Sequence, residues 1–288
     1  MAIGRALQSV SELPIVGLPK RGITVRKVVA IANQKGGVGK TTTSVNLAAC
    51  LANEGCRVLL IDMDPQGNAT SGLGIDRQQC EASIYDALVD DSAVDSLCLS
   101  TPTDGLDLIP STPDLAGAQI ELVDHGRREF QLRRALNAYD SDHDFVLLDC
   151  PPSLGLLTLN ALTASHTVLV PIQTEYYALE GLGHLLNTVD LIHEHLNPAL
   201  SLEGIVLTMY DGRTNLSQQV ADEVADHFGD LVFDTIIPRN VRLGEAPSYG
   251  VPITEYASSS RGARSYRDFA REFLRRNGGG PSPTKAAS

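Results

Sequence analysis

Short apolar runs alternate along the chain with longer stretches of helical periodicity. The first run, Val28–Ala32, is rich in β-branched residues and has the length of a buried strand, whereas Ser44–Asn53 repeats its apolar residues every three or four positions, as a helix does. Six further runs have strand character: Arg57–Asp62, Leu106–Ile109, Phe145–Asp149, Thr167–Ile172, Gly204–Met209 and Leu231–Ile236. Helical periodicity lies between most of these runs and includes Leu154–Ala164, Leu179–Leu196 and Leu216–Phe228.

The alternation predicts a single α/β domain. Strands separated by helices pair in parallel, so we expect a doubly wound, mostly parallel central sheet that binds ligands at the carboxyl ends of its strands. The chain has 288 residues, 43% of them hydrophobic, which is enough for a full core. We expect this domain to span residues 25–276. A flexible arm (1–24), with a short helix near Arg5–Val10, would precede it, and a disordered tail (277–288) rich in Gly, Pro and Ser would follow.

Cysteine usage and charge limit the class of protein. The five cysteines are scattered and form no Cys-x-x-Cys pair, so we expect reduced thiols in a soluble, cytoplasmic protein. The N-terminus lacks the apolar core of a signal peptide. The net charge of −12 opposes nucleic-acid binding at first sight, yet residues 236–276 contain eight arginines and four acidic residues. A basic face on an acidic protein therefore stays open, as does a solvated arginine-rich helix.

The most specific motif lies between the first strand and the first helix. Residues 35–42 read Lys35, Gly36, Gly37, Val38, Gly39, Lys40, Thr41 and Thr42. The second half matches a phosphate-binding loop, in which backbone N–H groups at a helix N-terminus surround phosphate oxygens. The first glycine of the usual pattern would fall at Gln34, and an additional lysine follows it. This is the deviant Walker A motif of P-loop NTPases, and the chain resembles the ParA/Soj and MinD family of dimerising ATPases.

The motif and the resemblance assign roles to the loop residues. We expect Lys40 to contact the β and γ phosphates of ATP, the hydroxyl of Thr41 to bind Mg²⁺, and Thr42 to anchor the α phosphate. The resemblance implies that Lys35 reaches into the partner subunit's site, so that two chains enclose two ATP molecules in a sandwich dimer. Lys35 and Lys40 would then both be catalytic, because phosphoryl transfer depends on cations placed on developing charge.

Two strand ends carry candidate carboxylates. Asp62 and Asp64 are one residue apart and would point to opposite faces of a continuing strand, so only one of them can easily face the phosphates. The resemblance gives Asp64 the orientation of the attacking water, with Asp62 supporting it. The run Phe145–Asp149 has the form of a Walker B strand, whose aspartate contacts Mg²⁺ through water. The candidate metal residues are Thr41, Asp64 and Asp149.

The later motifs indicate the base and the branch of the family. No Asn-Lys-x-Asp guanine motif occurs, which favours ATP over GTP, and the resemblance places four residues at the adenine: Thr208, Met209, Pro238 and Asn240. The stretches 208–216 and 236–248 look like those of ParA/Soj partition ATPases. Within them Arg213 and Arg242 match positions that bind DNA non-specifically in that family, and Arg239 is a further candidate. For each arginine the alternative is a structural salt bridge. Guanidinium groups suit phosphate oxygens.

The resemblance spans about residues 25–276. It implies an ATP-bound homodimer on nucleoid DNA and a ParB-like centromere-binding protein that stimulates hydrolysis, so that a chromosome or a plasmid is segregated. The short arm favours a chromosomal origin.

The main rival is a MinD-like membrane-cycling cell-division ATPase. Arg261–Arg276 is basic and amphipathic, and its apolar stripe suits either a membrane surface or a protein core. A nitrogenase-type reductase would need paired cysteines, and a tyrosine kinase of this fold would need a tyrosine-rich tail. A small-molecule kinase or synthetase stays open.

Overall fold

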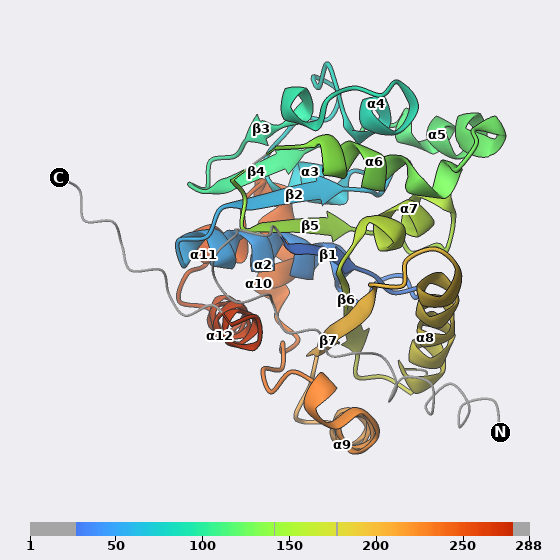
Figure 1. Ribbon diagram of the computed structural model, residues 1–288. Helices are drawn as coiled ribbons and strands as arrows, with labels where there is room; N and C mark the ends of the chain where they lie inside the picture. Colours follow the sequence, from blue (N-terminus) through green and yellow to red (C-terminus); the bar gives the residue numbers. More distant parts are fainter. Residues whose placement is uncertain (1–26, 141, 177, 279–288) are drawn as a thin grey trace.

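A seven-stranded sheet forms the centre of the computed structural model, which describes residues 27–140, 142–176 and 178–278 (Figure 1). The strands are β1 (Lys27–Ile31), β2 (Val58–Asp62), β3 (Leu99–Ser100), β4 (Leu106–Ile109), β5 (Phe145–Asp149), β6 (Thr167–Gln173) and β7 (Ser201–Thr208). Their order is β3-β4-β2-β5-β1-β6-β7, and all neighbours are parallel except β3 and β4. The predicted single α/β domain with a mostly parallel sheet is confirmed.

Helices cover both faces of the sheet (Figure 1). One face carries α4 (Ile84–Val89), α5 (Leu115–Glu121), α6 (Gln131–Ala138), α7 (Leu156–Ala164), α8 (Ala178–His195) and α9 (Asn215–Phe228). The other carries α2 (Lys40–Asn53), α3 (Asn68–Gly72), α10 (Val241–Glu245), α11 (Ile253–Tyr256) and α12 (Arg261–Arg276).

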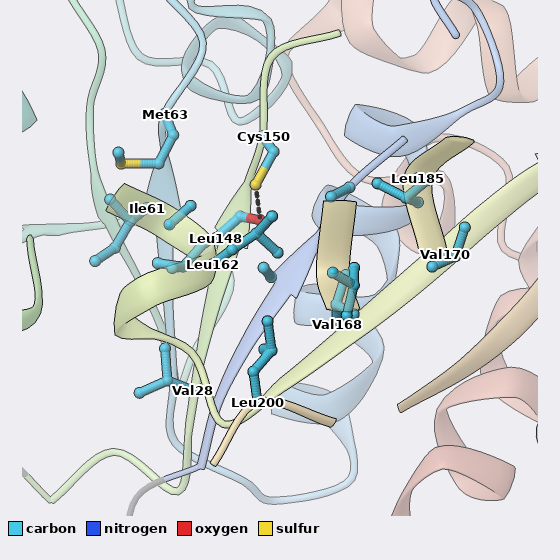
Figure 2. Close-up of a cluster of buried hydrophobic side chains, with 14 of the residues drawn as sticks. Val28, Ile61, Met63, Leu148, Cys150, Leu162, Val168, Val170, Leu185 and Leu200 are labelled. Carbon is cyan, nitrogen blue, oxygen red and sulfur yellow. Dashed lines mark hydrogen bonds between the residues drawn. The ribbon is translucent and has the colours of Figure 1, made fainter. Parts of the chain in front are cut away.

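Strands β1, β2, β5 and β6 are mostly apolar because both of their faces are buried. In β1, Val28 and Ala30 belong to one core cluster, whereas Val29 and Ile31 belong to the other. Figure 2 shows the first cluster, in which side chains of β1, β2, β5 and β6 meet Leu162 of α7 and Leu185 of α8. Continuous apolar runs are typical of parallel strands covered on both sides. The carboxyl ends of these strands therefore all meet at one edge, where polar side chains can gather.

Helix α12 packs its apolar stripe against the core. Tyr266 places its hydroxyl 3.1 Å from Thr43 Oγ1 of α2, and Phe273 meets Phe145 of β5 edge to face at 5.5 Å between ring centroids. Phe269 meets Phe233 in the same way at 4.8 Å. The stripe is thus the core-packing alternative of the two that the sequence left open. No helix in the described ranges is both long enough and apolar enough to cross a bilayer.

The predicted strand Leu231–Ile236 is wrong. Phe233 donates its N–H to Ile205 O of β7 at 2.9 Å, and Ile237 donates to Leu207 O at 2.9 Å, so the segment follows the edge of the sheet. Between these contacts the N–H groups of Asp234 and Thr235 donate to the Glu272 carboxylate of α12, each at 2.8 Å. Glu272 thus accepts from two consecutive N–H groups, and the hydrogen bonding to β7 is interrupted between Phe233 and Ile237.

The flexible arm and the disordered tail are predictions that rest on amino-acid composition. The predicted arm (1–24), with its helix near Arg5–Val10, and residues 279–288 of the predicted tail lie outside the described residues. Asn277, where the predicted tail begins, is buried and donates to Glu203 Oε1 at 2.7 Å.

Two glycines bring the loop after α3 against the loop after α10. Gly74 (φ +78°) and Gly250 (φ +67°) both have left-handed backbone conformations. A Cβ atom at Gly250 would lie 2.6 Å from Gly74 Cα, and one at Gly74 would lie 2.8 Å from Gly250 O. Only glycine combines this conformation with so close an approach of two backbones.

The packing of α12 predicts a large stability loss on truncation of its central ring. Phe269 is fully buried, so Phe269→Ala should lower the free energy of unfolding by about 3–5 kcal/mol. Urea denaturation would measure this. Arg264 lies on the exposed face of the same helix, and Arg264→Ala should change the value by less than about 0.5 kcal/mol. Similar, small losses for both variants would contradict the core role of the stripe.

Candidate functional site

The loop between β1 and α2 is held in a phosphate-binding conformation. Gly37 (φ +75°) and Gly39 (φ +87°) take left-handed conformations, and Gly39 is the N-cap of α2. Asn33 fixes the entry to the loop, since its Nδ2 donates to Pro171 O at 2.8 Å and its Oδ1 accepts from Lys35 N at 2.9 Å. Free N–H groups at the start of a helix favour an anion, so the local geometry agrees with the predicted loop function.

Lys40 points along this loop and is largely buried. Its Nζ donates to Lys35 O at 3.2 Å. Burial lowers the pKa of Lys40, while the nearby Asp149, Cys150 and Asp64 act in the opposite direction. An ammonium group has three donors, and the contact with Lys35 O engages one of them. Lys40 can therefore offer further donors to phosphate oxygens at the start of α2.

Asp149 lies beside the first turn of α2. Its Oδ2 accepts from Thr41 Oγ1 and its Oδ1 accepts from Ser44 Oγ, both at 2.8 Å. Burial raises the pKa of Asp149 above its usual value, and the charge of Asp62, its register partner on β2, raises it further. A hydroxyl and a carboxylate so placed are the hard oxygen ligands that Mg²⁺ prefers. Thr41 and Asp149 thus fit a magnesium site.

Asp62 supports the chain that follows β2. Its Oδ2 accepts from the N–H and the hydroxyl of Thr70, each at 2.8 Å, and its Oδ1 accepts from Asp64 N at 3.1 Å. Burial raises the pKa of Asp62 as well, while these hydrogen bonds oppose the shift. The side chain therefore ties α3 to the end of β2.

Asp64 begins a tight turn at the same edge of the sheet. Its Oδ1 accepts from Gln66 N at 2.9 Å, and its main-chain oxygen accepts from Gly67 N at 2.8 Å and from Ser111 Oγ at 2.7 Å. Arg77 holds the far side of this turn through the carbonyl groups of Pro65 and Gln66. The charges of Asp64 and Asp149 both act on the pKa of Lys40. These three predicted site residues therefore lie near one another.

Lys35 pairs with an acidic residue of its own chain. Its Nζ lies 3.2 Å from Glu175 Oε2, in the loop after β6, and about a third to a half of each side chain is exposed. Sequence reasoning missed Glu175 because 140 residues separate the pair. The predicted role of Lys35 in a partner subunit's site would require this contact to break.

The four predicted adenine residues lie on two segments that run side by side, since Ile237 N donates to Leu207 O at 2.9 Å and Tyr210 N donates to Ile237 O at 3.1 Å. Thr208 and Met209 lie against the loop, where Thr208 Oγ1 donates to Val38 O at 2.8 Å and a Cβ on Gly39 would lie 3.9 Å from Met209 Cε. Pro238 bridges to Tyr210, and Asn240 caps α10 by accepting from Arg242 N at 2.9 Å.

A cavity of about 430 Å³ lies beside Thr41 and Thr42. Its lining includes Asn46, Asn68, Ser71 and Pro247 and contains none of the four predicted adenine residues. Apart from Thr41 and Thr42, sequence reasoning missed the residues of this lining. The one signal was helical spacing, since Asn46 lies one turn after Thr42 and donates to its carbonyl oxygen at 2.8 Å.

The three candidate DNA-binding arginines are exposed. Arg213 forms a two-point contact with Asp211 at 2.8 and 2.6 Å, although 86% of its side chain is exposed. Arg242 contacts Glu245 at 3.0 Å, and Arg239 lies between them in the sequence. Exposed ion pairs contribute about 0–1 kcal/mol to the free energy of unfolding, so the guanidinium groups of Arg213 and Arg242 can exchange partners at small cost.

Comparison with known proteins gives a consistent result. Residues 26–202 match the family described as AAA domain. The chain is 60% identical over 246 residues to "Sporulation initiation inhibitor protein Soj" of Bacillus subtilis, covering 85% of this chain and 97% of that one. It is 52% identical to "Chromosome partitioning protein ParA" of Myxococcus xanthus, covering 91% and 93%. A structure of cobyrinic acid a,c-diamide synthase from Mycobacterium smegmatis with a bound ATP analogue and magnesium is 42% identical, with a TM-score of 0.76 and coverage of 87% and 95%.

The buried carboxylates predict a pH dependence of stability. Their pKa values are raised in the folded chain, so between about pH 4 and those raised values the folded state binds more protons than the unfolded state, and stability falls as pH rises. Without nucleotide, the melting temperature should fall from pH 5 to pH 8. The fall should be smaller in Asp149→Asn and unchanged in Asp268→Asn, which alters an exposed carboxylate of α12. Equal slopes in all three proteins would contradict the origin assigned here.

Proposed function

The chain belongs to the Soj/ParA family of chromosome-partitioning ATPases, and from this membership we propose that it uses cycles of ATP binding and hydrolysis, with Mg²⁺, to segregate DNA. The observation that carries this proposal is the contact of Thr41 and Ser44 with Asp149 beside the buried Lys40. It places a cation, a hydroxyl and a carboxylate at the start of one helix, as Mg-ATP requires.

Each residue of the site has a distinct part in the proposed reaction. The backbone of residues 36–39 and Thr42 hold the phosphates, while Lys40 contacts their β and γ oxygens. Thr41 and Asp149 would hold the Mg²⁺ ion, Asp149 through water. Bound Mg²⁺ supplies positive charge to the phosphate oxygens. Asp64, fixed by its turn, orients the water that attacks the γ phosphate.

ATP binding produces a sandwich dimer in this proposal. Lys35 exchanges Glu175 for the phosphates in the partner's site, and the exchange is favourable because a nucleotide triphosphate carries more negative charge than one carboxylate. Adenine lies near Thr208 and Met209, with Pro238 and Asn240 at the edge of its site. Each active site then depends on a residue from the other chain, so hydrolysis and dimer dissociation are linked.

DNA binding follows from dimerisation. A single patch formed by Arg213, Arg239 and Arg242 on a chain of net charge −12 binds DNA weakly. Two patches in fixed orientation bind with a high effective concentration, so ATP can increase DNA affinity without any new contact within a subunit. A ParB-like centromere-binding protein then stimulates hydrolysis and releases the dimer, and the protein cycles between the cytoplasm and the nucleoid.

Two alternative functions, membrane cycling and small-molecule synthesis, would require other features of the protein. Membrane cycling of the MinD type would use an amphipathic helix on the surface, but the stripe of α12 is buried against α2 and β5. The name of the Mycobacterium smegmatis structure favours a second candidate, an ATP-dependent synthase of a small-molecule amide. The Bacillus subtilis and Myxococcus xanthus relatives, which are 60% and 52% identical to this chain, are named for sporulation control and chromosome partitioning. An ATPase rate that is independent of DNA and of a ParB-like protein would favour the synthase.

Asp64→Ala should separate nucleotide binding from hydrolysis. The variant should bind Mg-ATP with wild-type affinity and form a long-lived dimer, while its partner-stimulated hydrolysis should fall about 100-fold or more, because the carboxylate acts only on the attacking water. Equilibrium binding, light scattering and phosphate release would measure the three properties. Lys40→Ala is the contrasting variant and should lose ATP affinity and dimerisation together. Wild-type hydrolysis by Asp64→Ala would mean that another residue positions the water.

Arg213→Ala and Arg242→Ala should each weaken DNA binding regardless of sequence. Each should also lower the salt dependence of the binding constant by about one unit per lost phosphate contact. ATP-dependent dimerisation should persist in both. Arg57, an exposed arginine paired with Asp142, provides the matched control, and Arg57→Ala should bind DNA as the wild type does. Full DNA affinity of a variant at raised salt would show that its arginine is structural.

A further inference from the structure

One arginine outside the nucleotide-binding motifs holds the turn that follows Asp64. Arg77 lies in the loop after α3, and its Nη2 donates to Pro65 O at 2.7 Å while its Nη1 donates to Gln66 O. The planar fork of a guanidinium can bridge two neighbouring acceptors in this way, whereas a lysine ammonium is a single point charge.

The two peptide groups that Arg77 holds are also the ones that fix Asp64. The carbonyl of Pro65 and the N–H of Gln66 belong to one peptide group, and that N–H donates to Asp64 Oδ1 at 2.9 Å. The carbonyl of Gln66 and the N–H of Gly67 form the next, and that N–H donates to Asp64 O at 2.8 Å. Peptide groups are planar, so fixing a carbonyl also fixes the direction of its N–H. Arg77 thereby orients two of the donors to Asp64, the third being Ser111 Oγ.

Local structure orders both the turn after Asp64 and the loop that carries Arg77. Gly67 has φ +64°, and a Cβ atom there would lie 2.9 Å from Arg77 Nη1, so the turn fits closely around the guanidinium. The loop of Arg77 is closed by Asp76, which accepts from Gln78 N at 3.0 Å and from Gln79 Nε2 at 2.8 Å. The arginine therefore presents its fork from a fixed position.

We propose that Arg77 is a positioning residue for ATP hydrolysis, which keeps the Asp64 carboxylate in the orientation that water attack requires. The inference rests on the proposed role of Asp64. Arg77 acts on the turn rather than on the phosphates, so its loss lowers kcat and leaves ATP affinity unchanged. Displacement of a catalytic group by about 1 Å can cost about 100-fold in rate, so a loosened turn is sufficient for a large effect.

The test compares Arg77→Met and Arg77→Lys with Arg134→Met in the full-length chain. Arg134 is a partly exposed arginine of α6 that pairs with Asp91, so its variant controls for the loss of one ion-paired guanidinium. We expect kcat to fall about tenfold or more in both Arg77 variants, with the KM for Mg-ATP and its equilibrium affinity within about twofold of the wild type. Arg134→Met should retain the wild-type kcat, and all three melting temperatures should stay close to that of the wild type.

Three results would overturn the proposal: an unchanged kcat in Arg77→Met, a fall in ATP affinity as large as the fall in kcat, or full activity of Arg77→Lys, which would show that charge alone suffices. Asp64→Ala, measured alongside, separates this inference from the proposed function. If Asp64→Ala is inactive and Arg77→Met has the wild-type kcat, only the role of Arg77 fails. If Asp64→Ala hydrolyses ATP normally, the role of Asp64 fails first.

Discussion

Two carboxylates buried side by side at the ends of β2 and β5 determine how the rest of the site is built. Asp62 and Asp149 are register partners, and each raises the cost of ionising the other. Burying charge is expensive unless it is compensated, and here the compensation comes from the hydroxyl groups of Thr41, Ser44 and Thr70, with Lys40 close by. The carboxyl groups therefore hold their protons more tightly than usual, and a divalent cation bound beside Asp149 would favour its ionised form.

The sequence predicted this site where the signal was local. Strands, helices and the phosphate loop follow from periodicity and from contiguous residues, and the Walker B aspartate follows from the position of its strand. Contacts between distant segments left no such signal. Glu175 approaches Lys35 only because β1 and β6 are neighbours, and Glu272 removes the N–H groups of Asp234 and Thr235 from a strand that the apolar pattern favoured. Arg77 was equally hidden, since it makes its contacts through backbone carbonyls, which any sequence possesses.

Three cations proposed to act outside their own subunit have an acidic neighbour within it. Lys35 pairs with Glu175, Arg213 with Asp211, and Arg242 with Glu245. All three pairs are at least partly exposed, where water and salt weaken ion pairing. Such neighbours lower the attraction of a single chain for phosphate while leaving the cations in place. A polyanion that engages several of them together can displace the acids, so the arrangement favours multivalent over single contacts.

The contact between Gly74 and Gly250 has a consequence for how this sequence can change over time. Gly74 lies in the loop after α3, and Gly250 ends the 3-10 helix Ala246–Tyr249 that comes after α10. Neither position has space for a methyl group while the other backbone stays where it is. A substitution at either position therefore depends on where the backbone of the other lies. Either glycine can be replaced only if the two loops move apart. The loop after α3 and the loop that ends at Gly250 therefore restrict each other's sequence changes.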